Sequence, residues 1–305
     1  MKKLFSVLLV TVLALGLGAC TSKKDDANTG ADDNRPEKLV MGFVPSSNSD
    51  TIADTVEPLA ELLSQRLDIE VEGRVMTNYN ALVEAMGTNE VQIGFVPSFA
   101  YVVANEEYGV EVILKSERYG SGSYVGQYLV RTDSGIDTMD DLRGKVWAYG
   151  DATSTSGFLF PASQIIDLYS DVTDPTTDFF SDTVESGSHD NSIIAVMEGN
   201  ADVATTFDDA RVLVSEDYPN IMTDTKVIGY TDPIPNDTIS VTKELDDELV
   251  QEIREAFYGF NANEDMLAIM KDVYSWDAIA LAEDSEYDVV RSTYNKFKDS
   301  INLGN

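Results

Sequence analysis

The chain has 305 residues, of which 43% are hydrophobic, so it is long enough for a large core and about two domains. Its formal net charge is −33, from 21 Lys and Arg against 54 Asp and Glu, and a surface this acidic excludes nucleic acid as a partner. Cys20 is the only cysteine, which excludes a disulfide framework and a cysteine zinc site.

The first 19 residues have the pattern of a secretory signal peptide. Two lysines precede a short apolar run at 4–17, and small residues follow it. The sequence Leu-Gly-Ala-Cys that ends at Cys20 resembles the lipobox of bacterial lipoproteins, which implies that Cys20 is the lipidated first residue of the mature chain. A signal peptide with an incidental cysteine is the alternative.

Residues 20–37 are polar and charged, without apolar periodicity, and predict a flexible tether. No later segment is long and apolar enough to span a bilayer. The expected location is therefore outside the cytoplasm, with the lipid anchor as the only membrane attachment.

Short β-rich segments alternate with helical segments from residue 39 onward. The first unit has predicted strands at 39–44, 71–76, 91–96 and 110–115. Its predicted helices lie at 58–67, 79–86 and 98–107, with Pro58 in the first turn of its helix. This succession predicts a parallel sheet with both faces covered by helices.

A second α/β unit follows a strand at 124–131 and a short helical link at 138–143. Its predicted strands lie at 145–149, 179–184, 201–207, 226–230 and 238–242. Its predicted helices lie at 162–169, at 190–198 and after Asp208. The tail is predicted to be helical and amphipathic, at 246–258, 264–273 and 286–300.

Two successive α/β units predict an α/β protein with two lobes, each a mostly parallel sheet flanked by helices. The expected division gives residues 38–128 and 239–305 to lobe 1 and residues 129–238 to lobe 2. Segments 126–131 and 238–242 are the predicted strands between the lobes. Ligands bind beyond the carboxyl ends of strands in such sheets, so the predicted site is a cleft between the lobes.

A run of hydroxyl side chains lies between a predicted strand and a predicted helix. Ser154, Thr155 and Ser156 belong to it. The first N–H groups of a helix have no internal partner and carry the positive end of the dipole, so hydroxyls among them form an anion site. An ordinary helix cap is the alternative. His189, the only histidine, lies at a second predicted helix start, where a structural role is the alternative.

Four further polar residues lie next to predicted strands, namely Tyr79, Tyr124, Asp209 and Asp237. For the tyrosines the alternative is a place in the core. For Asp209 it is a helix cap, and for Asp237 a place in a turn.

Together these segments resemble the phosphonate-binding proteins of ABC importers, which have the type II periplasmic-binding-protein fold. The resemblance covers residues 39 to about 242. It is carried by NYNALVEAM with Tyr79, GSGSYVG with Tyr124, STSGFLFP at 154–161, SGSHDNSIIAV around His189, ADVATTFDD to Asp209 and IPNDTISV with Asp237. It implies an ABC importer permease and its ATPase as partners.

The resemblance also implies how the ligand is held. Ser154, Thr155, Ser156 and His189 would bind the phosphonate oxygens. Tyr79 and Tyr124 would close over the ligand from the other side. Asp209 and Asp237 would face a ligand ammonium. A ligand with both charges is an aminoalkylphosphonate, such as 2-aminoethylphosphonate.

Several alternatives stay open. A binder of phosphite, phosphate or methylphosphonate has the same fold. A hydrolase could use Ser154 or Ser156 with His189, although the chain has no GxSxG nucleophile motif. A ligandless surface lipoprotein or adhesin is a further alternative. One histidine and scattered carboxylates lack metal-ligand spacing, so neither a metal nor a cofactor is predicted.

Overall fold

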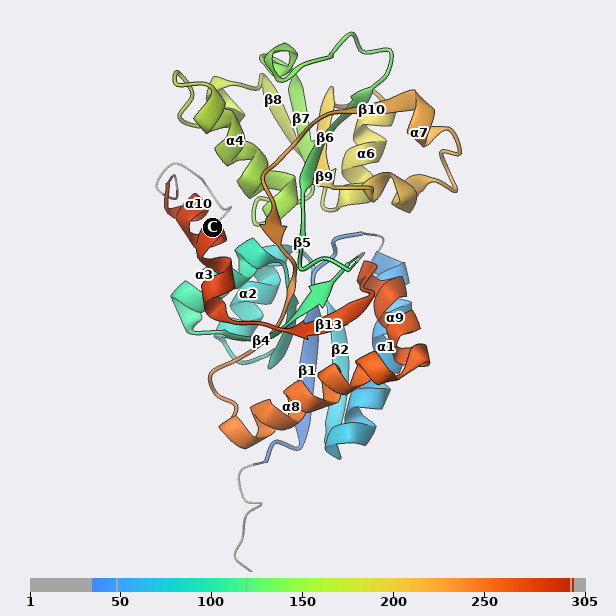
Figure 1. The fold of residues 1–305 in the computed structure, drawn as a ribbon, viewed down its shortest axis with the longest axis vertical. Coiled ribbons are helices and arrows are strands. Elements are labelled where there is room, and N and C mark those ends of the chain that lie inside the picture. Colours follow the sequence, from blue (N-terminus) through green and yellow to red (C-terminus); the bar gives the residue numbers. More distant parts are fainter. Residues whose placement is uncertain (1–34, 48, 119, 297, 299–305) are drawn as a thin grey trace, which may run out of the picture. The chain divides into compact units, whose positions relative to one another are not determined.

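A six-stranded sheet organises the first lobe in the computed structural model, which describes residues 35–298 apart from positions 48, 119 and 297. Its order is β13-β4-β12-β3-β1-β2 (Figure 1). The strands are β1 (Lys38–Phe43), β2 (Glu70–Val75), β3 (Ile93–Val96), β4 (Glu111–Glu117), β12 (Thr238–Val241) and β13 (Ala278–Leu281). β1 pairs in parallel with β2 and β3, whereas β12 is antiparallel to β3 and β4.

Helices cover this sheet. They are α1 (Ser49–Leu67), α2 (Tyr79–Gly87), α3 (Ser98–Tyr108), α8 (Asp247–Gly259) and α9 (Glu264–Tyr274), while α10 (Asp288–Asn295) packs against α3. The predicted start of α1 at Pro58 is wrong, because the helix begins at Ser49 and Pro58 lies inside it. Ile52, Val56 and Leu59 are buried at helical spacing on both sides of the proline, and this apolar face favours the longer helix despite the missing N–H.

A five-stranded sheet organises the second lobe, in the order β10-β6-β9-β7-β8. The strands are β6 (Gly126–Arg131), β7 (Val146–Tyr149), β8 (Asp182–Glu185), β9 (Val203–Phe207) and β10 (Thr225–Tyr230). Its helices are α4 (Phe160–Leu168), α5 (Pro175–Asp178), α6 (His189–Met197) and α7 (Ile221–Asp224). The predicted strand at 179–184 is displaced, because Phe179 and Phe180 are buried after α5 and the strand begins only at Asp182.

Short turns of other helix types complete the lobes. A π-helical turn, Thr155–Leu159, leads into α4. The 3-10 turns are Met139–Leu142, Ala210–Val214, Phe260–Ala262 and Asp284–Tyr287. The helix predicted after Asp208 is therefore a 3-10 turn, whereas the short helical link predicted at 138–143 is confirmed.

The chain crosses between the sheets at a two-stranded sheet of β5 (Ser123–Tyr124) and β11 (Ile234–Pro235). Figure 1 shows β5 between the two larger sheets. The predicted continuous strand 124–131 is wrong, because β5 and β6 belong to different sheets. The two strands predicted to lie between the lobes instead lie inside them, since β6 is in the second sheet and β12 in the first. Val125, between β5 and β6, is in neither strand, and a run of β-forming residues does not reveal this break.

Three buried clusters form the core. One lies under α1, α8 and α9 in the first lobe, and another surrounds α6 in the second. The third includes Phe99 and Val102 of α3 together with Phe158 and Leu159 of the second lobe. Apolar packing therefore joins the two lobes beside the crossover. The predicted signal peptide, Cys20 and nearly all of the predicted tether lie outside the described residues.

Candidate ligand-binding site

A small cavity lies where the carboxyl ends of strands from both sheets meet. Its volume is about 30 Å³, and it is lined by Val44, Ser46, Tyr79, Phe95, Pro97, Arg118, Tyr124, Ser154, Thr155, Ser156, His189, Phe207, Asp237 and Trp276. Most of these residues follow β1, β2, β3, β4, β7, β8 or β9 directly or after a short turn. This is the edge at which open α/β sheets bind ligands.

The predicted hydroxyl run forms one side of the cavity. Ser154, Thr155 and Ser156 are at most 2% exposed, at the start of the π-helical turn that precedes α4. The Ser154 Oγ accepts the Gly157 N–H at 3.1 Å, so its own proton remains available to a ligand. A Cβ at Gly157 would lie 2.8 Å from that Oγ, so glycine permits this close approach. Ser154 can therefore cap the helix and donate to an anion at the same time, although the two roles were stated as alternatives.

His189 lies beside the hydroxyl run at the start of α6, capped by Ser188. Its side chain is 4% exposed and its ring lies edge-on to Phe207, with 5.0 Å between centroids. Burial, aided by the nearby Arg118, lowers the pKa of His189 to about 3, so the imidazole is neutral at pH 7. Its Nδ1 has no hydrogen-bond partner among the described residues. A neutral imidazole still provides one N–H donor for an anion.

An ion pair that the sequence analysis missed forms another side of the cavity. Arg118 Nη2 lies 2.7 Å from Asp237 Oδ2, and the two side chains are 12% and 17% exposed. Arg118 follows β4 and Asp237 precedes the neighbouring strand β12, whose pairing brings both residues to one edge. Burial raises the pKa of Asp237, and the Arg118 guanidinium opposes that rise. At this separation the guanidinium favours the carboxylate form at neutral pH.

Both predicted tyrosines line the cavity. Tyr79 is 2% exposed and is the first residue of α2. Tyr124 lies in β5 with the Arg118 guanidinium 5.7 Å from its ring centroid. Burial raises the pKa of Tyr124, while hydrogen bonds with the Ser156 and Thr155 hydroxyls act in the opposite direction. Tyr124 is therefore a protonated phenol beside the hydroxyl run.

Asp209 does not join this group. It is exposed, has a left-handed φ of 61°, and lines a neighbouring chamber of about 140 Å³ with Asp208. The structure therefore does not place Asp209 with Asp237 at the cavity, because the turn after β9 directs it outward. Arg118, Tyr124 and Phe207 line both spaces.

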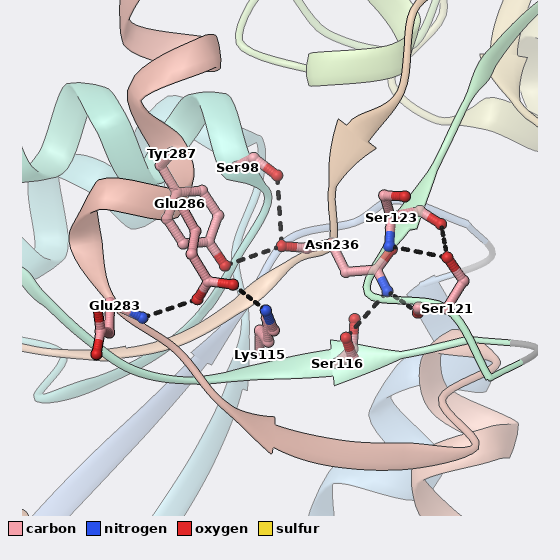
Figure 2. A network of polar contacts seen from close by, with 9 residues as sticks. All are labelled: Ser98, Lys115, Ser116, Ser121, Ser123, Asn236, Glu283, Glu286 and Tyr287. Atoms are coloured by element: carbon pink, nitrogen blue, oxygen red, sulfur yellow. Dashed lines mark hydrogen bonds and ion pairs between the residues drawn. The ribbon is translucent and has the colours of Figure 1, made fainter.

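A buried network fixes the segment that carries Asp237 (Figure 2). The Asn236 amide donates to the carbonyls of Ser116 at 3.0 Å and Ser121 at 2.8 Å. The Asn236 backbone carbonyl accepts the Tyr287 hydroxyl at 3.1 Å, so the C-terminal 3-10 turn contacts the crossover. Asn236 is fully buried. The network therefore holds the backbone on both sides of Arg118 and beside Asp237.

Known proteins share both the sequence pattern and the fold. The model of the family described as ABC transporter, phosphonate, periplasmic substrate-binding protein matches residues 41–287. A curated relative from Mycolicibacterium smegmatis, named a phosphate-import protein PhnD, is 25% identical over 92% of this chain and 91% of its own.

Two solved structures have the same type II periplasmic-binding-protein fold. A binding protein component of an ABC phosphonate transporter from Pseudomonas aeruginosa has a TM-score of 0.75 at 22% identity and 86% coverage of both chains. PhnD1 from Prochlorococcus marinus, solved with methylphosphonate, has a TM-score of 0.76 at 18% identity, covering 87% of this chain and 99% of its own. Because the family model spans most of the chain, this protein belongs to the periplasmic substrate-binding proteins of ABC phosphonate transporters.

Proposed function

We propose that this chain captures a compact phosphorus oxyanion (phosphate, phosphite or methylphosphonate) in the interlobe cavity and delivers it to an ABC importer. The Arg118–Asp237 ion pair is the observation that carries the choice of ligand. The acidic residue expected to bind a ligand ammonium already has a guanidinium 2.7 Å away. A ligand therefore needs no positive charge of its own to neutralise Asp237.

The neutral donors suit the oxyanion itself. Hydroxyls of Ser154, Thr155 and Ser156, a neutral His189 and the first backbone N–H groups of the π-helical turn can all donate to phosphorus-bound oxygens. The small volume of the cavity, about 30 Å³, favours a compact head group. A phosphate-import relative and a methylphosphonate-bound structural neighbour agree with this ligand class.

A second candidate is an aminoalkylphosphonate, the ligand expected from the sequence. The neighbouring chamber of about 140 Å³ supports it, because Asp208 and Asp209 line that chamber and it adjoins the cavity at Arg118 and Tyr124. An ammonium group on a short carbon chain would reach those carboxylates past Arg118, Tyr124 and Phe207, which line both spaces.

Hydrolysis is less well supported than binding. Ser154 is engaged with the Gly157 N–H, and in the described part of the chain no hydrogen bond joins His189 to a serine hydroxyl. A nucleophilic serine needs a base within hydrogen-bond reach. The transport proteins of this family are not enzymes.

Isothermal titration of the chain without residues 1–37 tests the ligand class. Phosphate, phosphite, methylphosphonate and 2-aminoethylphosphonate are titrated under the same conditions. Binding of the first three, with no advantage for the amino compound, is the expected result. Tight binding of 2-aminoethylphosphonate alone would assign the acidic chamber to the ammonium and refute the compact-anion proposal.

The proposal also includes the anchor and the partners. The Leu-Gly-Ala-Cys motif supports cleavage before Cys20 and lipidation of that residue, which would hold the protein outside the cytoplasm beside the permease and its ATPase. Mass spectrometry of the N-terminal peptide tests the lipid, and Cys20→Ser is expected to release the protein from the membrane fraction. None of the helices described within residues 35–298 combines the length and the apolarity needed to cross a bilayer.

A further inference from the structure

Three hydrogen bonds connect the first lobe to the second around the cavity. The Tyr79 N–H donates to Asp151 Oδ2 at 3.1 Å, the Phe99 N–H to Thr155 Oγ1 at 2.9 Å, and the His189 N–H to the Ser46 carbonyl at 3.1 Å. Each donor lies in the first turn of a helix, namely α2, α3 or α6. These N–H groups have no partner inside their own helices, so the opposite lobe satisfies them.

Asp151 differs from the other two acceptors because it carries a charge. Its carboxylate is 7% exposed and lies at the N-terminus of α2, where the helix dipole favours a negative group. Asn78 caps the same helix from within the first lobe through the Ala81 N–H. α2 therefore has one cap from its own lobe and one from the opposite lobe.

The rest of the Asp151 side chain is held inside the second lobe. Its Oδ1 accepts the Thr153 N–H at 2.8 Å and the Thr153 hydroxyl at 2.6 Å. Two donors from its own lobe thus hold the carboxylate, and Oδ2 is directed at α2. A fixed acceptor loses little side-chain entropy when it forms the interlobe bond.

We propose that Asp151 is a positioning residue for ligand binding, which caps α2 across the cleft and lengthens the lifetime of the closed, ligand-bound form. The inference rests on the proposed function, because its consequence is measured on bound anion. The Phe99 N–H likewise fixes the position of Thr155 Oγ1 at the cavity from the opposite lobe.

Asp151→Asn isolates the interlobe bond. The two Thr153 donors hold the amide oxygen in the place of Oδ1, so the amide NH₂ faces the Tyr79 N–H as donor against donor. The bonds inside the second lobe remain, and the substitution is expected to fold.

Asp174→Asn is the matched control. The Asp174 carboxylate accepts the Thr176 N–H at 2.9 Å and the Thr176 hydroxyl at 2.7 Å, the same local pattern as at Asp151. It caps α5 inside the second lobe and does not line the cavity. Both variants remove one negative charge and retain the local turn.

Stopped-flow fluorescence tests the proposal, because Trp276 lines the cavity. Observed rates are measured against the concentration of phosphate and, separately, of methylphosphonate, so that the slope gives kon and the intercept gives koff. Asp151→Asn is expected to raise koff about tenfold or more through loss of a charge-assisted bond, with less than about a threefold change in kon. Asp174→Asn is expected to leave both rate constants unchanged.

Urea unfolding without ligand completes the comparison, with the two variants expected to lose similar amounts of stability. An unchanged koff in Asp151→Asn, or an equal rise in Asp174→Asn, would overturn the role of Asp151 while the proposed function stands. An unsubstituted chain that binds neither anion would overturn the proposed function and this inference with it.

Discussion

The second lobe faces the cavity with neutral side chains, whereas the first lobe faces it with an ion pair. Ser154, Thr155, Ser156 and a histidine of lowered pKa form the neutral side. Arg118 and Asp237 form the charged side. The two sides differ in origin as well, because the neutral side is built at helix starts and the charged side at the paired ends of β4 and β12.

This difference indicates separate tasks. Neutral donors at a helix start recognise oxygen atoms without fixing the number of charges on the ligand. The ion pair sets the formal charge of the cavity, since among the described residues that line it Arg118 is the only Lys or Arg and Asp237 the only carboxylate. Removing one member of the pair therefore changes the formal charge of the cavity in a known direction, on a protein of net charge −33.

Arg118→Ala is expected to have the largest effect. It leaves Asp237 buried without its cation, so the cavity becomes anionic and repels phosphate. Like charges about 4 Å apart repel by roughly 4 kcal/mol near a protein surface, so we expect at least about a hundredfold loss of affinity. Titration with phosphate and methylphosphonate measures this loss.

Arg211→Ala is the control for Arg118→Ala, because Arg211 lies in the 3-10 turn Ala210–Val214, outside the cavity. It removes the same charge from the protein. Similar losses in the two variants would mean that the net charge, and not the pair with Asp237, controls anion binding.

The neutral side has a pH signature through His189. Its pKa is about 3 in the folded chain and near 6.5 in the unfolded chain, so between these values only the unfolded chain binds the proton. Stability contributed by His189 is therefore complete above the unfolded pKa. It falls as the pH decreases toward 3, by up to about 1.4 kcal/mol per pH unit.

Urea unfolding at pH 7, 6, 5 and 4 measures this dependence. Carboxylates also titrate in the lower part of the range, so His189→Gln is measured in parallel. The variant is expected to lose less stability than the unsubstituted chain between pH 6.5 and 4. Identical slopes would show that the histidine is not held neutral by burial.

The neutral side could be predicted from the sequence more readily than the charged side. Ser154, Thr155 and Ser156 are consecutive, so a strand and a helix around them were enough to place them together. Arg118 was missed because the predicted strand ended at 115, whereas β4 continues to Glu117. Its partner Asp237 is 119 residues away, and only the pairing of β4 with β12 brings the two together.

Contacts between the lobes were likewise beyond sequence reasoning. The hydrogen bond from the Tyr79 N–H to the Asp151 carboxylate joins residues 72 positions apart. Neither residue type predicts such a bond. The two lobes and most strands followed from local periodicity. The change of sheet after Tyr124 did not, because Val125 is itself a β-forming residue and the apolar pattern of 124–131 continues through it.

Ser154→Ala tests the two roles of Ser154, as a helix cap and as a hydrogen-bond donor to the ligand. It removes one hydroxyl donor and the acceptor of the Gly157 N–H. We expect about a tenfold loss of affinity for phosphate, phosphite and methylphosphonate alike, together with about 1 kcal/mol of stability from the lost cap.

Ser156→Ala is the companion variant, because Ser156 is two residues after the capping Ser154 and lines the same cavity. It is expected to lower affinity to a similar extent and stability less. Titration and urea unfolding separate the two effects. A loss confined to one ligand would contradict a role for either serine in binding the shared oxyanion.

Asp237→Asn is expected to change phosphate affinity least. Whether the affinity rises or falls distinguishes the possible roles of Asp237. The amide oxygen can still accept from Arg118, but the cavity gains a formal positive charge, so phosphate affinity should rise by roughly threefold. If Asp237 instead binds a ligand ammonium, the same variant weakens 2-aminoethylphosphonate strongly and leaves phosphate unchanged. Titration of both ligands distinguishes these outcomes, and a fall in phosphate affinity would mean that Asp237 serves mainly to position Arg118.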